Sequence, residues 1–137
     1  MNNENVVNEL ITSAERNGLI STLYATFGKT VKVSIPLSRK TLDTDVDEID
    51  FSVRACNALK RTGLMQVEAV VDAIAEERLM HIRNLGRKSY NEIQTKLLVL
   101  GYGKLTPAEK KQFFYDVLKR NGYAGRAGKE NGMRREP

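Results

Sequence analysis

The 137-residue sequence has one cysteine, one histidine and no long run of apolar residues. The single cysteine, Cys56, excludes an internal disulfide framework and is typical of a protein kept in a reducing cytoplasm. Together with the single histidine, His81, it is too little for a cysteine–histidine zinc site. A catalytic Cys–His pair stays formally open, although a lone buried cysteine usually packs as a small hydrophobic residue. No apolar run approaches the ~20 residues of a membrane-spanning helix, and the polar N-terminus has no secretory signal pattern.

The net charge of +5 is unevenly distributed along the sequence. Residues 1–50 contain 5 basic and 8 acidic side chains, for a net charge of −3. Residues 51–103 contain 8 basic and 5 acidic side chains, for a net charge of +3. Residues 104–137 contain 9 basic and 4 acidic side chains, for a net charge of +5. An acidic front with a basic middle and tail indicates a nucleic-acid partner, although a solvated charged surface gives similar totals.

Apolar residues recur at helical spacing through most of the sequence, which predicts an all-α fold. Residues 19–27 also permit a strand, and residues 31–35 are expected to be a short strand or an extended linker ended by Pro36. We expect a compact bundle of four to five short helices with a helix-hairpin-helix-like turn, plus flanking helical extensions. The expected helical segments are 4–16, 19–27, 52–62, 67–74, 79–82, 90–100 and 107–120.

Local signals predict a helix start, a buried stripe and a helix end in the middle of the sequence. Ser52 is a plausible N-cap, because its hydroxyl can accept from a free N–H of the first turn. Val53, Cys56 and Leu59 are expected to form the buried stripe of the helix that follows. The run Gly101-Tyr102-Gly103 is expected to end the last helix of the central region.

The stretch Asn84-Leu85-Gly86-Arg87-Lys88-Ser89 lies between two apolar-periodic segments and offers the most specific chemistry in the sequence. A short glycine turn that opens a helix presents backbone N–H groups without intrahelical partners, at the positive end of the helix dipole. Phosphate is a natural ligand for such a turn. We therefore expect Gly86, Arg87, Lys88 and Ser89 to bind phosphates, while Leu85 packs into the core.

Arg54, Asn57 and Lys60 follow one another at three-residue spacing, so they share a face of the predicted helix 52–62. That face holds the hydrogen-bond donors that phosphates and minor-groove base edges accept. A plain solvent-exposed face accounts for the arginine and the lysine equally well. On chemistry alone, a DNA-contact face and a plain solvent-exposed face are equally good interpretations.

An acid cluster precedes this helix and comprises Asp43, Asp45, Asp47, Glu48 and Asp50. As metal ligands these carboxylates would need a fixed loop and more chelating geometry than their spacing promises. A solvated acidic approach to a helix N-terminus is the simpler interpretation, because the helix dipole favours negative charge there. The sharper interpretation is a contact surface for a basic partner.

Two longer stretches carry a family resemblance. They are Val46-Asp47-Glu48-Ile49-Asp50-Phe51-Ser52-Val53-Arg54-Ala55-Cys56-Asn57-Ala58-Leu59-Lys60 and Arg83-Asn84-Leu85-Gly86-Arg87-Lys88-Ser89-Tyr90-Asn91-Glu92-Ile93. With the helix order intact over about residues 45–103, the sequence resembles the C-terminal domain of the bacterial RNA polymerase α subunit. The turn alone is less specific, because helix-hairpin-helix modules of repair enzymes and ligases carry similar ones.

The resemblance implies a compact helical domain that binds DNA in the minor groove near A·T-rich promoter-upstream sequence. The contact residues that it implies are Arg54, Asn57, Gly86, Lys88 and Ser89. The arginine would enter the narrow, electronegative groove while the turn holds flanking phosphates. Ala58 stands where the family often has a small or thiol residue, so any contact from that side chain is lost.

The resemblance also assigns a role to part of the acid cluster. In the family an acidic strip before the first helix faces basic residues of the sigma factor's promoter-reading region. Asp47, Glu48 and Asp50 match that strip. The protein-contact interpretation of these three residues is thereby strengthened, and sigma factor or core polymerase becomes a candidate partner.

The sequence departs from the family before the matched region. A polymerase α subunit has a large N-terminal domain that dimerises and nucleates assembly, whereas about 45 residues precede the match here. We therefore expect a cytoplasmic, nucleoid-associated DNA-binding protein that acts as an accessory or competitor in transcription, with no cofactor, metal or catalytic residues. One alternative is a polymerase-binding adaptor with secondary DNA binding. Another is a helix-hairpin-helix accessory subunit of a repair or nuclease system.

These signals predict four segments. Residues 1–44 would be an N-terminal helical extension and linker, and residues 45–103 the DNA-binding domain. Residues 104–122 would form an additional helix, because Thr106-Pro107-Ala108-Glu109 combines a capping threonine, a proline at the first helical position and a glutamate that completes a capping box. Residues 123–137 lack apolar periodicity and are expected to be a disordered basic tail.

Overall fold

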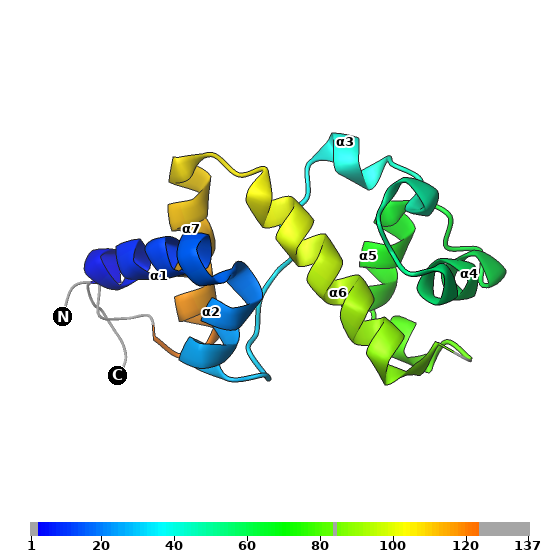
Figure 1. Ribbon diagram of the computed structural model, residues 1–137, viewed down its shortest axis with the longest axis horizontal. Coiled ribbons are helices and arrows are strands. Elements are labelled where there is room, and N and C mark those ends of the chain that lie inside the picture. The colour runs from blue at the N-terminus through cyan, green and yellow to red at the C-terminus, as the bar shows by residue number, and fades with distance from the viewer. Residues whose placement is uncertain (1–2, 84, 124–137) are drawn as a thin grey trace. The chain divides into compact units, whose positions relative to one another are not determined.

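The computed structural model describes residues 3–83 and 85–123, and within these ranges the regular structure is helical (Figure 1). The α-helices are α1 (Asn3–Asn17), α2 (Leu19–Phe27), α3 (Arg39–Leu42), α4 (Val53–Arg61), α5 (Val67–Ala75), α6 (Gly86–Gly103) and α7 (Pro107–Arg120). Two 3₁₀ turns, η1 (Val46–Glu48) and η2 (Leu79–His81), complete the set. The predicted all-α class is confirmed, residues 19–27 are helical, and residues 31–35 are extended without pairing as a strand.

The protein divides into two compact units. The central unit is residues 35–103, and the terminal unit combines residues 1–34 with residues 104–137. The sequence-based boundary at residue 45 leaves 35–44 outside the central domain, yet Ile35, Leu37 and Leu42 pack against its core. Asn84 and residues 124–137 of the expected disordered tail 123–137 lie outside the described residues, whereas Tyr123 is described and its ring packs on Phe27.

The core of the central unit is formed by small and branched apolar side chains from α4, α5, η2 and α6. Leu59 of α4, Val67 of α5 and Leu79 of η2 are fully buried there. Ile93 and Leu97 of α6 are fully buried with them, so α6 forms the long wall against which the shorter helices pack (Figure 1). Burying side chains of this size stabilises the fold by about 1.5–3 kcal/mol each.

The helix α4 buries a different stripe from the one expected. Ala55, Ala58 and Leu59, at i, i+3 and i+4, face the core, whereas Val53 is 77% exposed. Val53 precedes Ala55 by two residues, which is roughly 200° around a helix, so the two side chains point in opposite directions. The prediction that Val53 is buried is wrong, because two small alanines rather than the β-branched valine allow α4 to approach the core closely.

Gly101 has a packing role in α6. The helix continues through Gly101 and ends at Gly103, so the expected termination spans its last turn. Gly101 is buried, and a Cβ atom there would overlap the carbonyl oxygen of Pro36. The absence of a side chain therefore lets the extended segment before α3 lie directly on α6.

The terminal unit packs α1, α2 and α7 together. Leu10 of α1, Leu23 of α2 and Phe114 of α7 are among its buried side chains. The predicted capping box of α7 is confirmed: the Thr106 Oγ1 accepts from the N–H of Glu109 at 3.2 Å, and the Glu109 carboxylate accepts from the N–H of Thr106 at 2.9 Å. Helices from both ends of the sequence thus form one unit.

Two further contacts fix the end of α7. The Asn121 side chain accepts from the N–H of Lys32 at 2.9 Å and donates to the Lys32 carbonyl at 2.8 Å. The ring of Tyr123 meets the ring of Phe27 edge-on, with centroids 5.5 Å apart. The segment after α2 is therefore bound directly to the C-terminal end of α7.

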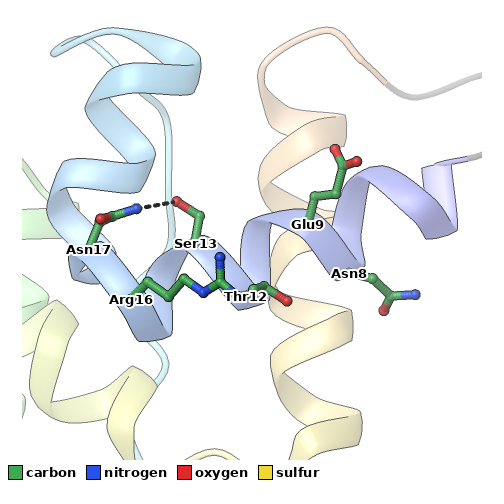
Figure 2. A pocket seen from close by; sticks show the side chains of 6 residues that line it. All are labelled: Asn8, Glu9, Thr12, Ser13, Arg16 and Asn17. Carbon is green, nitrogen blue, oxygen red and sulfur yellow. Dashed lines mark hydrogen bonds between the residues drawn. The ribbon is translucent and has the colours of Figure 1, made fainter.

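The outward face of α1 carries an open, shallow depression (Figure 2). The residues that line it are Asn8, Glu9, Thr12, Ser13, Arg16 and Asn17. Within it Asn17 donates to the Ser13 hydroxyl at 3.4 Å, and Ser13 also shares a 2.8 Å hydrogen bond with Thr22 of α2. The bond between Ser13 and Thr22 ties α1 to α2 across the turn at Gly18.

Candidate nucleic-acid interface

The first turn of α4 is held in place by its N-cap. The Ser52 hydroxyl accepts from the backbone N–H of Ala55 at 3.1 Å, which confirms the predicted cap. Arg54, Asn57 and Lys60 are all exposed on the side of α4 that faces away from the core. The structure therefore presents the three predicted side chains together on one outward face.

The start of α6 forms the second part of the candidate interface. Gly86 adopts a φ of 79°, a left-handed conformation that favours glycine, and opens the helix. Gly86, Arg87, Lys88 and Ser89 are its first four residues, so their backbone N–H groups have no intrahelical partner. Arg87 and Lys88 are exposed, but Ser89 as a whole is only 6% exposed. Ser89 is therefore less accessible to an anion than the two cations that precede it.

A hydrogen-bonded link between α4 and α6 brings the two parts together. The Glu92 carboxylate accepts from the Ser52 backbone N–H at 2.7 Å and from the Ser52 hydroxyl at 2.9 Å. Lys88 lies one turn before Glu92 and shares its face of α6. Since Arg54 follows Ser52 by two residues, the guanidinium of α4 and the ammonium of α6 project from neighbouring helix starts.

The positive charges of this region differ in whether the protein itself neutralises them. Arg39 pairs with Glu68 at 2.6 Å, Arg78 with Glu76 at 2.6 Å, and Lys96 with Asp50 at 3.4 Å. Within residues 3–83 and 85–123, no ion pair engages Arg54, Arg87 or Lys88. The cations at the two helix starts are thus available to an external anion.

Lys60 differs from the other predicted DNA-contact residues. Its ammonium donates to both carboxylate oxygens of Asp47, at 3.0 and 3.1 Å. This pairing lowers the pKa of Asp47 and raises that of Lys60. The ion pair is therefore complete at a pH above the usual carboxyl pKa near 3.8, and it is lost only when the pH falls below that value and Asp47 is protonated. At the other end, it is lost only when the pH rises above the usual lysine pKa near 10.5 and Lys60 is deprotonated.

Cys56 belongs to the same cluster. Its thiol donates to Asp47 at 3.3 Å, and its pKa is raised by burial and further by the adjacent carboxylate. A raised pKa keeps the sulfur protonated and poorly nucleophilic at neutral pH. Because the thiol is directed at Asp47 and not at His81 in η2, the geometry gives no support to a catalytic Cys–His pair.

Basic side chains of the protein itself neutralise part of the acid cluster. Asp43 pairs with Arg39 at 3.4 Å, and Asp47 and Asp50 pair with Lys60 and Lys96. Glu48 and Asp45 are exposed and form no ion pair with any residue that the structure describes. Over the same residues, the acidic, cysteine and histidine side chains form no group of three that could hold a metal ion.

Two contributors to this surface were not predicted. Glu92 links the starts of α4 and α6 through its hydrogen bonds to Ser52. It lies one helical turn after Lys88 in the sequence, and this spacing could have indicated that the two residues share a face of the helix. Val53 lies on the outward face beside Arg54. A helical projection centred on Ala55, Ala58 and Leu59 would have placed it there.

The central unit coincides with a match to a known family. Residues 33–98 match the C-terminal domain of the bacterial RNA polymerase alpha chain. A DNA-directed RNA polymerase subunit alpha of Alkaliphilus oremlandii (strain OhILAs) is 45% identical over 71 residues, which make up 52% of the present sequence and 22% of that protein. The same subunit of Bacillus velezensis (strain DSM 23117 / BGSC 10A6 / LMG 26770 / FZB42) is 45% identical over 64 residues, 47% of the present sequence and 20% of that protein.

The match therefore spans about a fifth of the length of these curated relatives. No solved structure matches the protein significantly. No helix among the described residues is long and apolar enough to cross a membrane.

Proposed function

Because residues 33–98 match the C-terminal domain of the bacterial RNA polymerase alpha chain, we propose that this protein binds duplex DNA through the starts of α4 and α6. The target is the minor groove of A·T-rich promoter DNA, and the role is in transcription at the bacterial nucleoid. The activity of the full-length relatives, including polymerase assembly, is not part of the proposal.

One observation carries this proposal. Arg54 projects from the first turn of α4 with no ion pair among the described residues, next to a helix N-terminus that carries Arg87 and Lys88. The link from Glu92 to Ser52 fixes the spacing of the two helix starts before any ligand arrives. Preorganised donors of this kind lose little conformational entropy on binding.

The division of labour follows from the chemistry of each part. The guanidinium of Arg54 suits the narrow A·T minor groove, where the negative potential is enhanced. The Asn57 amide can donate to the acceptors that A·T pairs present there. The amides at the start of α6 and the Lys88 ammonium suit the flanking phosphates. Ser89, which is buried, completes the first turn of the helix that presents these donors.

A competition experiment tests the choice of groove and sequence. We expect an unlabelled A·T-rich duplex to displace a bound A·T-rich probe at a concentration roughly tenfold or more below that needed for a G·C-rich duplex of equal length, because the arginine gains most from a narrow groove. A nicked duplex of the same sequence serves as the control for the helix-hairpin-helix repair alternative. Stronger competition by the nicked duplex than by the intact one would contradict the proposal and favour that alternative.

A second function, contact with sigma factor or core polymerase, is favoured by Glu48 and Asp45. These two exposed carboxylates have no ion pair among the described residues, so they are available to a basic protein surface. We expect Asp45→Asn with Glu48→Gln to lower the amount of polymerase that the tagged protein retains from a bacterial lysate. The affinity for DNA should change less than about threefold, because neither residue lies at the two helix starts. A threefold change corresponds to about 0.65 kcal/mol of binding free energy.

The matched control for that experiment is Glu76→Gln, which removes a carboxylate already paired with Arg78. It should leave polymerase retention unchanged. If the Asp45 and Glu48 variant retains as much polymerase as the unmodified protein, these two carboxylates are not the contact surface.

A further inference from the structure

The net positive charge of the protein lies entirely outside the central unit. Residues 35–103 contain 10 basic and 10 acidic side chains, so their net charge is zero. Residues 1–34 and 104–137 together contain the remaining 12 basic and 7 acidic side chains, and so carry the whole net charge of +5. The terminal unit, which the family match leaves almost entirely uncovered, is therefore the strongly basic part of the protein.

In the described part of this unit, basic charge is concentrated on α7. Lys111, Tyr115 and Lys119 follow one another at four-residue spacing and form a ridge along the helix. Lys111 and Lys119 are exposed, and Tyr115 between them is half-buried. Lys111 and Lys119 form no ion pair with any residue within 3–83 or 85–123.

The acidic residues of α7 are each bound by a group other than the ridge lysines. Glu109 accepts from the Thr106 N–H in the capping box. Asp116 accepts from the Arg120 guanidinium at 2.6 Å. Neither acidic residue of α7 therefore forms an ion pair with Lys111 or Lys119.

The ridge is also rigidly supported. The opposite face of α7 is buried through Phe113, Phe114, Val117 and Leu118. The capping box fixes its first turn, and Asn121 ties its end to Lys32. The helix is thus a preformed surface rather than a segment that must fold on binding.

We propose that the Lys111–Tyr115–Lys119 ridge of α7 is a second DNA-binding surface, which contacts backbone phosphates of the duplex that the central unit reads. The eight-residue separation of the lysines corresponds to about 12 Å along the helix, which is enough to reach separate phosphates of the duplex. The tyrosine hydroxyl between them is a further phosphate donor. Such contacts add affinity without sequence preference. The inference rests on the proposed function for the identity of the duplex, but it concerns a separate set of residues.

Salt dependence provides the test, with the full-length protein and the same A·T-rich duplex. Each phosphate contact contributes about 0.9 to the slope of log affinity against log salt. We expect Lys111→Gln with Lys119→Gln to make that slope shallower by about 1.8 and to weaken binding at about 0.1 M salt by roughly tenfold or more. The charge-preserving variant Lys111→Arg with Lys119→Arg should retain both the slope and the affinity.

The matched control removes the same charge from the same unit at Lys29 and Lys32, which lie outside α7. Lys29→Gln with Lys32→Gln should alter the slope by less than half as much. An equal effect of this control would overturn the proposal, because the unit would then act only through its total charge. An unchanged slope for the α7 variant would overturn it as well, and would leave an acidic protein as the occupant to consider.

Parallel measurements on Arg54→Ala separate this inference from the proposed function. If Arg54→Ala weakens binding and the α7 variant does not, the central unit reads DNA alone and the ridge proposal fails. If the α7 variant weakens binding and Arg54→Ala does not, the ridge binds phosphates and the minor-groove proposal fails.

Discussion

Replacement of Arg54 by alanine is expected to weaken binding to an A·T-rich duplex by about 100-fold. The loss of a charged donor from a narrow groove removes roughly 2–3 kcal/mol, and about 1.4 kcal/mol corresponds to a factor of ten in affinity. The measurement is fluorescence anisotropy with a labelled duplex at a stated salt concentration, because affinities for DNA depend steeply on salt. The thermal midpoint should be unchanged, since Arg54 is exposed and has no ion pair among the described residues.

Arg78→Ala is the matched control. It removes the same charge from the same unit, but Arg78 is paired with Glu76 in the turn between α5 and η2 and belongs to neither of the two helix starts. Its affinity should stay within about threefold of the unmodified protein. If Arg54→Ala also binds within threefold, the minor-groove role of α4 is wrong.

Replacement of Gly101 by alanine is expected to have the largest effect on stability. The added Cβ would overlap the Pro36 carbonyl oxygen, which belongs to the backbone and cannot rotate away. Overpacking of a close-packed interior typically costs about 1–3 kcal/mol, and a rigid neighbour places this site at the upper end. For a domain of this size the thermal midpoint should fall by roughly 10–20 °C.

Gly103→Ala provides the control two residues later in the same helix. A Cβ at Gly103 meets no atom within 4 Å, so the alanine adds no clash. The substitution should be neutral or stabilising by up to about 1 kcal/mol, since alanine favours the helix more than glycine. Equal destabilisation by both variants would contradict this explanation, because Gly103→Ala adds no clash and the overlap with Pro36 could not then account for the effect.

Much of the fold could be predicted because the decisive signals are local. Ser52 caps α4, Thr106 and Glu109 form a capping box, and Gly86 opens α6, each within a few residues of its partner. Helical periodicity indicated the all-α class for the same reason. The candidate interface was also readable in part, since Arg54 and Asn57 share a helix face.

The contacts that the sequence did not reveal are those between distant segments. Gly101 looks like a helix terminator from its neighbours alone, and only its approach to Pro36 shows why the helix continues through it. The ion pair between Lys60 and Asp47 joins one residue expected to contact DNA and one expected to contact a protein. It was not predicted, because a separation of thirteen residues gives no periodic signal in the sequence. The packing of α7 with α1 and α2 unites the two ends of the sequence, which no local pattern predicts.

The pairing of Lys60 with Asp47 also revises the picture of two independent surfaces. The carboxylate expected to face a protein partner holds the lysine expected to face DNA. A basic partner that engages Asp47 would release Lys60 for a phosphate. The two surfaces are therefore joined at this ion pair rather than separated by it.

The central claim is that the starts of α4 and α6 are the DNA-reading surface, and mapping of backbone amide shifts tests it most directly. Titration of the isotope-labelled full-length protein with an A·T-rich duplex should shift the amides of residues 52–57 and 86–89 most strongly, with separate changes along α7. Large shifts confined to the acidic strip at 43–50, with 52–57 and 86–89 unmoved, would contradict the account.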